Sequence, residues 1–175
     1  SLRLSTVQRV HASPFGGSEQ TVDLLNDRWI MSLTLSARAG FDKGAQIEAF
    51  IAALRGQTNY VALWHFARPA VRGTLASATA ASAAQGASAV VLTGSGTLKA
   101  GDMLGISGLL LQVAADVTVG TSTSVSIVNR LRTAVSGAVT LIKPTANFRL
   151  TGSPAVSYVP GMSEPVSLDF AEVVA

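Results

Sequence analysis

The stretch Arg28-Trp29-Ile30-Met31-Ser32-Leu33-Thr34-Leu35 decides the fold. Every second side chain in it is large and apolar, namely those of Trp29, Met31, Leu33 and Leu35. A period of two is typical of a β-strand that buries one face. A further strand is expected just before it, over residues 21–25, with Asn26-Asp27 forming a turn between the two.

The next segment carries the only clear helix pattern in the sequence, over about residues 43–55. Asp42 precedes it as a candidate N-cap, and Gly56 stands where a left-handed C-terminal residue belongs. The apolar positions of the segment are spaced as i, i+3, i+4 and i+7, at Ile47, Phe50, Ile51 and Leu54. This spacing puts them on one face of a helix, which we expect to lie on a sheet.

Two more strands complete this part of the chain. Residues 60–66 form a candidate strand that ends at Arg68-Pro69, and residues 166–173 alternate strictly at the other end of the sequence. A lone terminal strand needs a pairing partner, and the sheet of residues 1–72 is the simplest one. We therefore expect residues 1–72 and 151–175 to share one sheet, into whose sequence residues 73–150 are inserted.

The inserted segment, residues 73–150, has a different composition. Residues 76–89 are uncharged and rich in Ala and Ser without an apolar stripe, which indicates an extended edge strand and a loop. Short strand candidates follow, with breaks at Gly94-Ser95-Gly96, Gly101-Asp102, Ser107-Gly108, Gly120 and Ser136-Gly137; the candidates are residues 89–92, 103–106, 109–113, 117–119, 124–128, 139–142 and 147–150. Short strands at about ten-residue spacing predict a small antiparallel β-barrel or sandwich. The expected fold class is therefore mainly β.

The composition restricts the function. Hydrophobic residues make up 48% of the 175 residues and charged residues only 13%, which is about half the charged share of an ordinary soluble domain. The most hydrophobic stretch, residues 109–113, is five residues long with a Gln inside it, far too short for a membrane-spanning helix, and the start of the sequence lacks the apolar core of a signal peptide. No run of Lys and Arg suggests a nucleic-acid site, and the chain has no Cys.

Catalytic and metal-binding patterns are sparse. His11 and His65 belong to no metal-binding or nucleophile motif, and we interpret His65 as an ordinary strand residue. Asp102 follows a glycine at a predicted turn, where an aspartate caps its own backbone, and Asp116 has no carboxylate neighbour in sequence. Residues 94–99 lack the motif of a phosphate loop. We expect no enzymatic activity, no cofactor and no metal.

The order of features resembles the distal tail proteins of long-tailed (siphovirus-type) bacteriophages, the family that forms the ring at the end of the tail tube. The stretches that carry the resemblance are Ser13-Pro14-Phe15-Gly16-Gly17 before the Trp29 strand, the helix of residues 47–56, Leu98-Lys99-Ala100-Gly101-Asp102-Met103-Leu104-Gly105-Ile106, and Pro144-Thr145-Ala146-Asn147-Phe148-Arg149-Leu150. The resemblance implies a tail-tube-like β-sandwich with one helix, and an inserted oligonucleotide/oligosaccharide-binding-type (OB-like) barrel.

The same resemblance implies the partners and the location. The chain would assemble as a homo-oligomer, a ring of six copies, in contact with the tail tube protein and the tail-tip hub proteins. DNA would only pass through the lumen, no membrane would be involved, and the protein would be made in the host cytoplasm and end in the virion. The large residues of the alternating strands are candidates for the subunit interface: Trp29, Met31, Tyr60, Trp64 and Phe66.

Several alternatives stay open on the sequence alone. Another tail protein of the same type (a tube, terminator or minor tail-tip protein) would share the strand–helix–strand pattern. A carbohydrate- or nucleic-acid-binding β-module would need aromatic residues for stacking, and residues 73–150 contain only Phe148. A monomeric β-domain and a small hydrolase are the remaining classes. A hydrolase would need an acid/base pair, and the sequence shows none.

Overall fold

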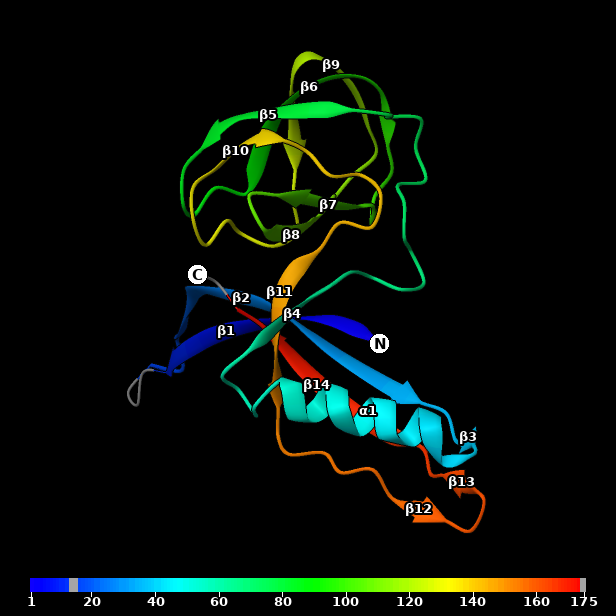
Figure 1. Ribbon diagram of the computed structural model, residues 1–175. Helices are drawn as coiled ribbons and strands as arrows, with labels where there is room; N and C mark the ends of the chain where they lie inside the picture. The colour runs from blue at the N-terminus through cyan, green and yellow to red at the C-terminus, as the bar shows by residue number, and fades with distance from the viewer. Residues whose placement is uncertain (13–15, 174–175) are drawn as a thin grey trace.

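The computed structural model describes residues 1–12 and 16–173 (Figure 1). Residues 13–15, part of the Ser13–Gly17 stretch named above, lie outside the described residues. The described chain is mainly antiparallel β with one α-helix, which confirms the expected fold class, and it is β-rich and sandwich-like. Its helix, α1 (Phe41–Ala53), has 13 residues, and no helix in the described part of the chain is long and apolar enough to cross a membrane.

The largest sheet joins the two ends of the sequence. Its five strands lie in the order β1, β2, β14, β11, β4. Their bounds are Leu2–Ala12, Glu19–Leu35, Val166–Glu172, Ala146–Thr151 and Tyr60–Leu63. Leu168 on β14 lies opposite Leu33 on β2, which confirms that the terminal strand pairs with the first sheet. β11 also belongs to this sheet, between β14 and β4, and not to the inserted segment, where the sequence predicts it.

Two predictions about the strands of this sheet are wrong. Asn26-Asp27 does not form a turn, because β2 continues through it as one 17-residue strand. Ser5 pairs with Arg28 and Val7 with Leu24, so the extra residues of β2 are accommodated as a bulge opposite β1. The predicted strand 60–66 ends at Leu63.

The helix α1 packs on the apolar face of the sheet, as expected. Ile47, Ile51 and Leu54 join the cluster formed by that face, whereas Phe50 of the predicted stripe is 38% exposed. The helix starts at Phe41 with Gly40 as its N-cap, so Asp42 lies in the first turn instead of capping it. Gly56 adopts the expected left-handed conformation, with φ of 65°.

A small three-stranded sheet lies at the N-terminal end of α1. It consists of β12 (Tyr158–Val159), β13 (Met162–Ser163) and β3 (Arg38–Ala39). Gly44 on the helix faces this sheet, and a Cβ atom there would lie 2.5 Å from Cε1 of Tyr158. The absence of a side chain at Gly44 therefore lets the sheet approach the helix.

The middle segment folds around a cluster of its own. Its four-stranded sheet has the order β10, β5, β6, β9, and a separate hairpin is formed by β7 and β8. The bounds are Val135–Ala138, Ala78–Ala83, Ala89–Leu98, Val117–Ser126, Met103–Ile106 and Leu109–Gln112. The predicted breaks at residues 94–96 and 120 lie inside β6 and β9, where register shifts accommodate them. The predicted strand 139–142 does not form: β10 ends at Ala138, and Thr140 and Ile142 make single bridges only.

The strands of the middle segment do not close into a barrel. Single bridges, Gly105 to Thr140 and Val113 to Ile127, connect the β7–β8 hairpin to neighbouring segments. The expected OB-like barrel is thus a set of antiparallel sheets around one core. The chain enters and leaves this segment side by side, since Ala70 bridges to Ile142 and the Lys143 N–H donates to the Pro69 carbonyl. Independent folding of residues 73–150 stays a prediction.

Candidate functional site

The five predicted interface residues divide into buried and exposed ones. Trp29 and Met31 are only 4% and 1% exposed within the chain, so their assignment to a surface interface is wrong. They face the core because the helix and the middle segment cover this face of β2. Tyr60 and Phe66 are 59% and 49% exposed and stay available for contact.

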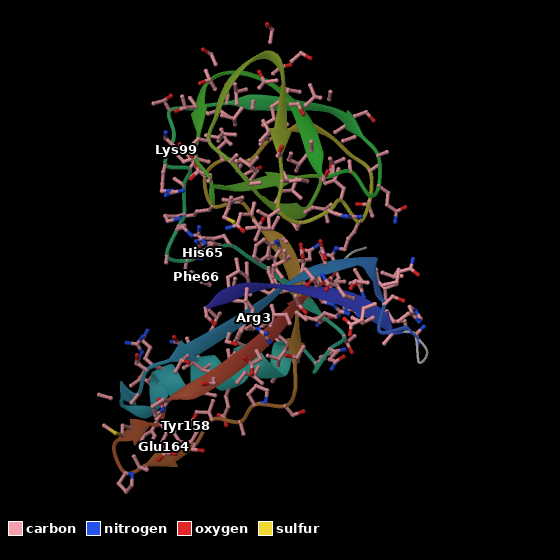
Figure 2. The ribbon with its side chains drawn as sticks, turned by 180° about the vertical axis from the view of Figure 1, so that it is seen from behind. Arg3, His65, Phe66, Lys99, Tyr158 and Glu164 are labelled. Carbon is pink, nitrogen blue, oxygen red and sulfur yellow. The ribbon has the colours of Figure 1, made fainter. Side chains whose placement is uncertain are left out.

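Trp64 is half-buried in a small cluster next to the middle segment. Its ring lies 4.8 Å from that of Phe66, and Nζ of Lys143 lies 5.3 Å from its ring centre. Figure 2 shows Phe66 and His65 on the segment that leads away from the five-stranded sheet. Since Lys143 covers part of Trp64, Phe66 is the more accessible of the two rings.

The most open feature of the large sheet is its β1 edge. Within the described residues, no strand pairs with the outer side of β1. β14 pairs with β2 only over residues 30–35 of β2, so residues 19–24 pair with β1 alone. We call residues 7–12 and 19–24 the hairpin arm; Figure 1 shows it running away from α1. It exposes Val10 by 56%, Val22 by 38% and Leu24 by 43%.

A polar junction joins the large sheet to the middle segment. Trp29 donates from Nε1 to the Leu110 carbonyl at 2.7 Å and from its backbone N–H to Glu172 Oε2 at 3.0 Å. Arg132 forms an ion pair with Glu172, with 2.7 Å between Nη2 and Oε2. Burial raises the pKa of Glu172 despite the charge of Arg132, and burial likewise lowers the pKa of Arg132. These contacts fix the middle segment against the sheet.

The candidate catalytic residues have structural roles. Asp102 is buried and accepts hydrogen bonds from the backbone N–H of Lys99 at 2.8 Å and of Arg72 at 3.1 Å, so it caps a turn as predicted. Asp116 is exposed and pairs with Lys99 at 2.9 Å. Residues 94–98 lie within β6, which pairs with β9, and not at the start of a helix.

His65 has no acid/base partner among the residues that the structure describes. Nε2 lies 3.3 Å from the Arg68 guanidinium, and Nδ1 is buried without a hydrogen-bond partner. Burial, followed by the charge of Arg68, lowers the pKa of His65. His11 is exposed near the end of β1, whereas His65 lines a pocket with Ser1 and Leu2 at the start of that strand. Over residues 1–12 and 16–173, no three His, Asp or Glu side chains are placed to hold a metal ion.

One charged feature could not be seen in the sequence. Arg28, Arg132 and Arg149 line a single groove at the end of β14, together with Glu172. The sequence has no run of basic residues that would indicate this groove, because its arginines come from three distant parts of the chain. Only the pairing of β2 and β11 with β14 brings Arg28 and Arg149 together, on the two strands that flank β14.

Comparison with known proteins adds no family assignment. No protein-family model matches the chain, and no curated protein matches it significantly.

Proposed function

We propose that the chain is a structural subunit of a closed ring at the end of a bacteriophage tail, where it joins the tail tube to the tail-tip proteins. Six copies is the number that the resemblance to distal tail proteins implies. In this proposal the protein is not an enzyme, and DNA passes through the ring without a dedicated reading site.

The uncovered β1 edge carries the proposal. A free edge strand offers unpaired N–H and C=O groups to another chain and is an aggregation hazard unless it is covered. β1 has 11 residues, its outer side lacks a partner strand among the described residues, and the hairpin arm beside it exposes Val10 and Val22. A neighbouring subunit that pairs with this edge would satisfy its free backbone groups. By covering the arm, it would also bury Val10 and Val22.

The low charge of the chain supports the same proposal. Obligate interfaces are more hydrophobic than free surface, and 13% charged residues suit a chain that hides part of its surface in an assembly. A heterologous contact, in which the arm of one copy meets a different surface of the next, generates a ring when the rotation closes. Exposed Tyr60 and Phe66 on and after the opposite edge strand, β4, are candidates for that second surface.

The test compares matched valine substitutions at two places. Native mass spectrometry of the wild type should give a closed oligomer, expected to be a hexamer. Val10→Asp, combined with Val22→Asp, puts charges on the arm and should yield monomers. Val128→Asp is the control, because Val128 is 48% exposed but belongs to the middle segment, and it should leave the oligomer intact.

Two results would refute the proposal. One is an oligomer that survives the arm substitutions but dissociates with Val128→Asp. The other is a tail reconstruction that places the chain outside the axial stack of tube and tip proteins.

A further inference from the structure

The arginine groove is built from separate elements of the fold. Arg28 lies on β2, Arg149 on β11, and Arg132 on the segment between β9 and β10. The groove has a volume of about 350 Å³ and is open to solvent. Glu172, at the end of β14, supplies the only acidic side chain among its described lining residues.

Glu172 holds the side chain of Arg132 in place. Its guanidinium pairs with Glu172 at 2.7 Å, and the two side chains are only 12% and 2% exposed. Glu172 also accepts the backbone N–H of Trp29 at 3.0 Å. The carboxylate therefore compensates Arg132 and fixes its orientation.

Arg28 and Arg149 are not compensated in this way. Neither guanidinium forms a hydrogen bond or an ion pair with another residue that the structure describes. The register explains why they share one face: Ala171 pairs with both Ile30 and Arg149, and Arg28 is two residues from Ile30 along β2. The charge of Arg28 also contributes to lowering the pKa of Arg132, which places the two cations close together.

The charges of the lining therefore do not cancel. Three arginines against one glutamate leave two positive charges. Asp27 is buried outside the lining, but its charge acts on Arg132 and partly offsets the lowering of that guanidinium's pKa by burial, so it reduces the net charge around the groove to one positive charge. Arginine stays protonated at any accessible pH, so the charges persist and an anion would be attracted to them.

We propose that this groove is a binding site for a phosphate monoester, such as the terminal phosphate of a nucleotide or oligonucleotide. Arginine forks match phosphate oxygens in geometry, and a phosphate monoester carries nearly two negative charges with three acceptor oxygens. A carboxylate offers only two acceptor oxygens, so it would satisfy fewer of the guanidinium donors of Arg28 and Arg149. Asn26 and Gln57 add neutral donors around the same space. The site stands on this geometry alone and does not rest on the ring assembly.

Titration calorimetry tests the site with stated probes: inorganic phosphate, a 5′-phosphorylated dinucleotide and the same dinucleotide with a 5′-hydroxyl. Arg28→Gln and Arg149→Gln should each weaken binding of the phosphorylated probe by about tenfold or more, since hydrogen bonds to charged groups are strong. Neither substitution breaks a hydrogen bond or an ion pair within the described chain, so the melting temperature should change little. Arg38→Gln, an exposed arginine outside the lining, is the matched control and should bind like the wild type.

The probes also separate the sources of the phosphate. Tighter binding of the 5′-phosphorylated probe supports a terminal phosphate, and equal binding of the 5′-hydroxyl probe would overturn that assignment in favour of the phosphodiester backbone. The site itself is refuted if the wild type shows no saturable binding, or if the Arg28→Gln/Arg149→Gln double variant binds as tightly as the wild type. A tetraglutamate peptide that binds as tightly at equal ionic strength would refute the assignment to phosphate.

Discussion

Leu110 and Leu111 are neighbours on β8, both with 0% exposure, yet they pack into different cores. Leu110 belongs to the cluster of Trp29 and Phe148 in the large sheet, and Leu111 belongs to the cluster of the middle segment. Successive side chains of a strand point to opposite faces, which explains the division. The pair allows each core to be perturbed by the same chemical change.

We expect Leu110→Ala and Leu111→Ala each to lower the free energy of unfolding by about 3–5 kcal/mol, the cost of a fully buried leucine plus the cavity left behind. For a chain of this size, each kcal/mol lowers the melting temperature by roughly 2–4 °C. The hydrogen bonds from Trp29 Nε1 and Asn129 Nδ2 to the Leu110 carbonyl involve the backbone and persist in the alanine variant. The lost energy therefore reports on side-chain packing.

The location of the loss distinguishes the two variants. Native-state hydrogen exchange should accelerate in β2, β11 and β14 for Leu110→Ala, and in β6 and β9 for Leu111→Ala. Leu24→Ala is the control, because Leu24 is 43% exposed on the hairpin arm and its truncation should cost far less. If Leu111→Ala instead loosened the large sheet more than Leu110→Ala, or if Leu110→Ala cost less than about 1 kcal/mol, the assignment of the two cores would be refuted.

Two further predictions concern single sites. Burial raises the pKa of Glu172 above its ordinary value near 4.5, so the folded state binds this proton more tightly than the unfolded state, and the contribution of Glu172 to stability grows as the pH falls from 7 toward 4.5. Urea unfolding should accordingly show the stability of the wild type relative to Glu172→Gln increasing over this range, and a decrease would mean that the pairing with Arg132 outweighs burial. Gly73→Ala should destabilise the middle segment by about 2 kcal/mol or more, because its Cβ would lie 1.8 Å from the backbone oxygen of Thr97. Gly120→Ala is the matched control, since its Cβ would meet Thr123 Oγ1 at an ordinary 3.8 Å, and thermal unfolding that fails to separate the two variants would contradict the prediction.

Local periodicity was sufficient to predict the elements that obey it. The alternation of residues 28–35 and 166–172 corresponds to β2 and β14, and the helical spacing of Ile47, Ile51 and Leu54 corresponds to the packed face of α1. These elements are set by their own apolar pattern, because each has one face against a core. Pairing of the terminal strand with the sheet of residues 1–72 followed from the need of a lone strand for a partner, and β2 is the strand that provides it.

Features that depend on neighbours could not be predicted in the same way. Asn26-Asp27 has the chemistry of a turn, but β1 pairs on both sides of it and turns it into a bulge. Trp29 and Met31 could equally have covered an interface between subunits, because alternation shows that one face is buried and does not show what buries it. Leu110 of the middle segment and the helix are what cover that face here.

The end of strand pairing explains where both proposed sites lie. The last pair between β14 and β2 joins Ala171 to Ile30, and the next residue of β14, Glu172, turns its side chain to the core. Beyond this point β2 has only β1 as a neighbour in the described chain, so Arg28 borders an open groove and residues 19–24 continue as the hairpin arm. Inside a sheet, neighbouring strands satisfy backbone groups and cover side chains, and where pairing stops both become available to other molecules. Register is a property of three strands that are distant in sequence, which is why neither the groove nor the arm was visible in the sequence pattern.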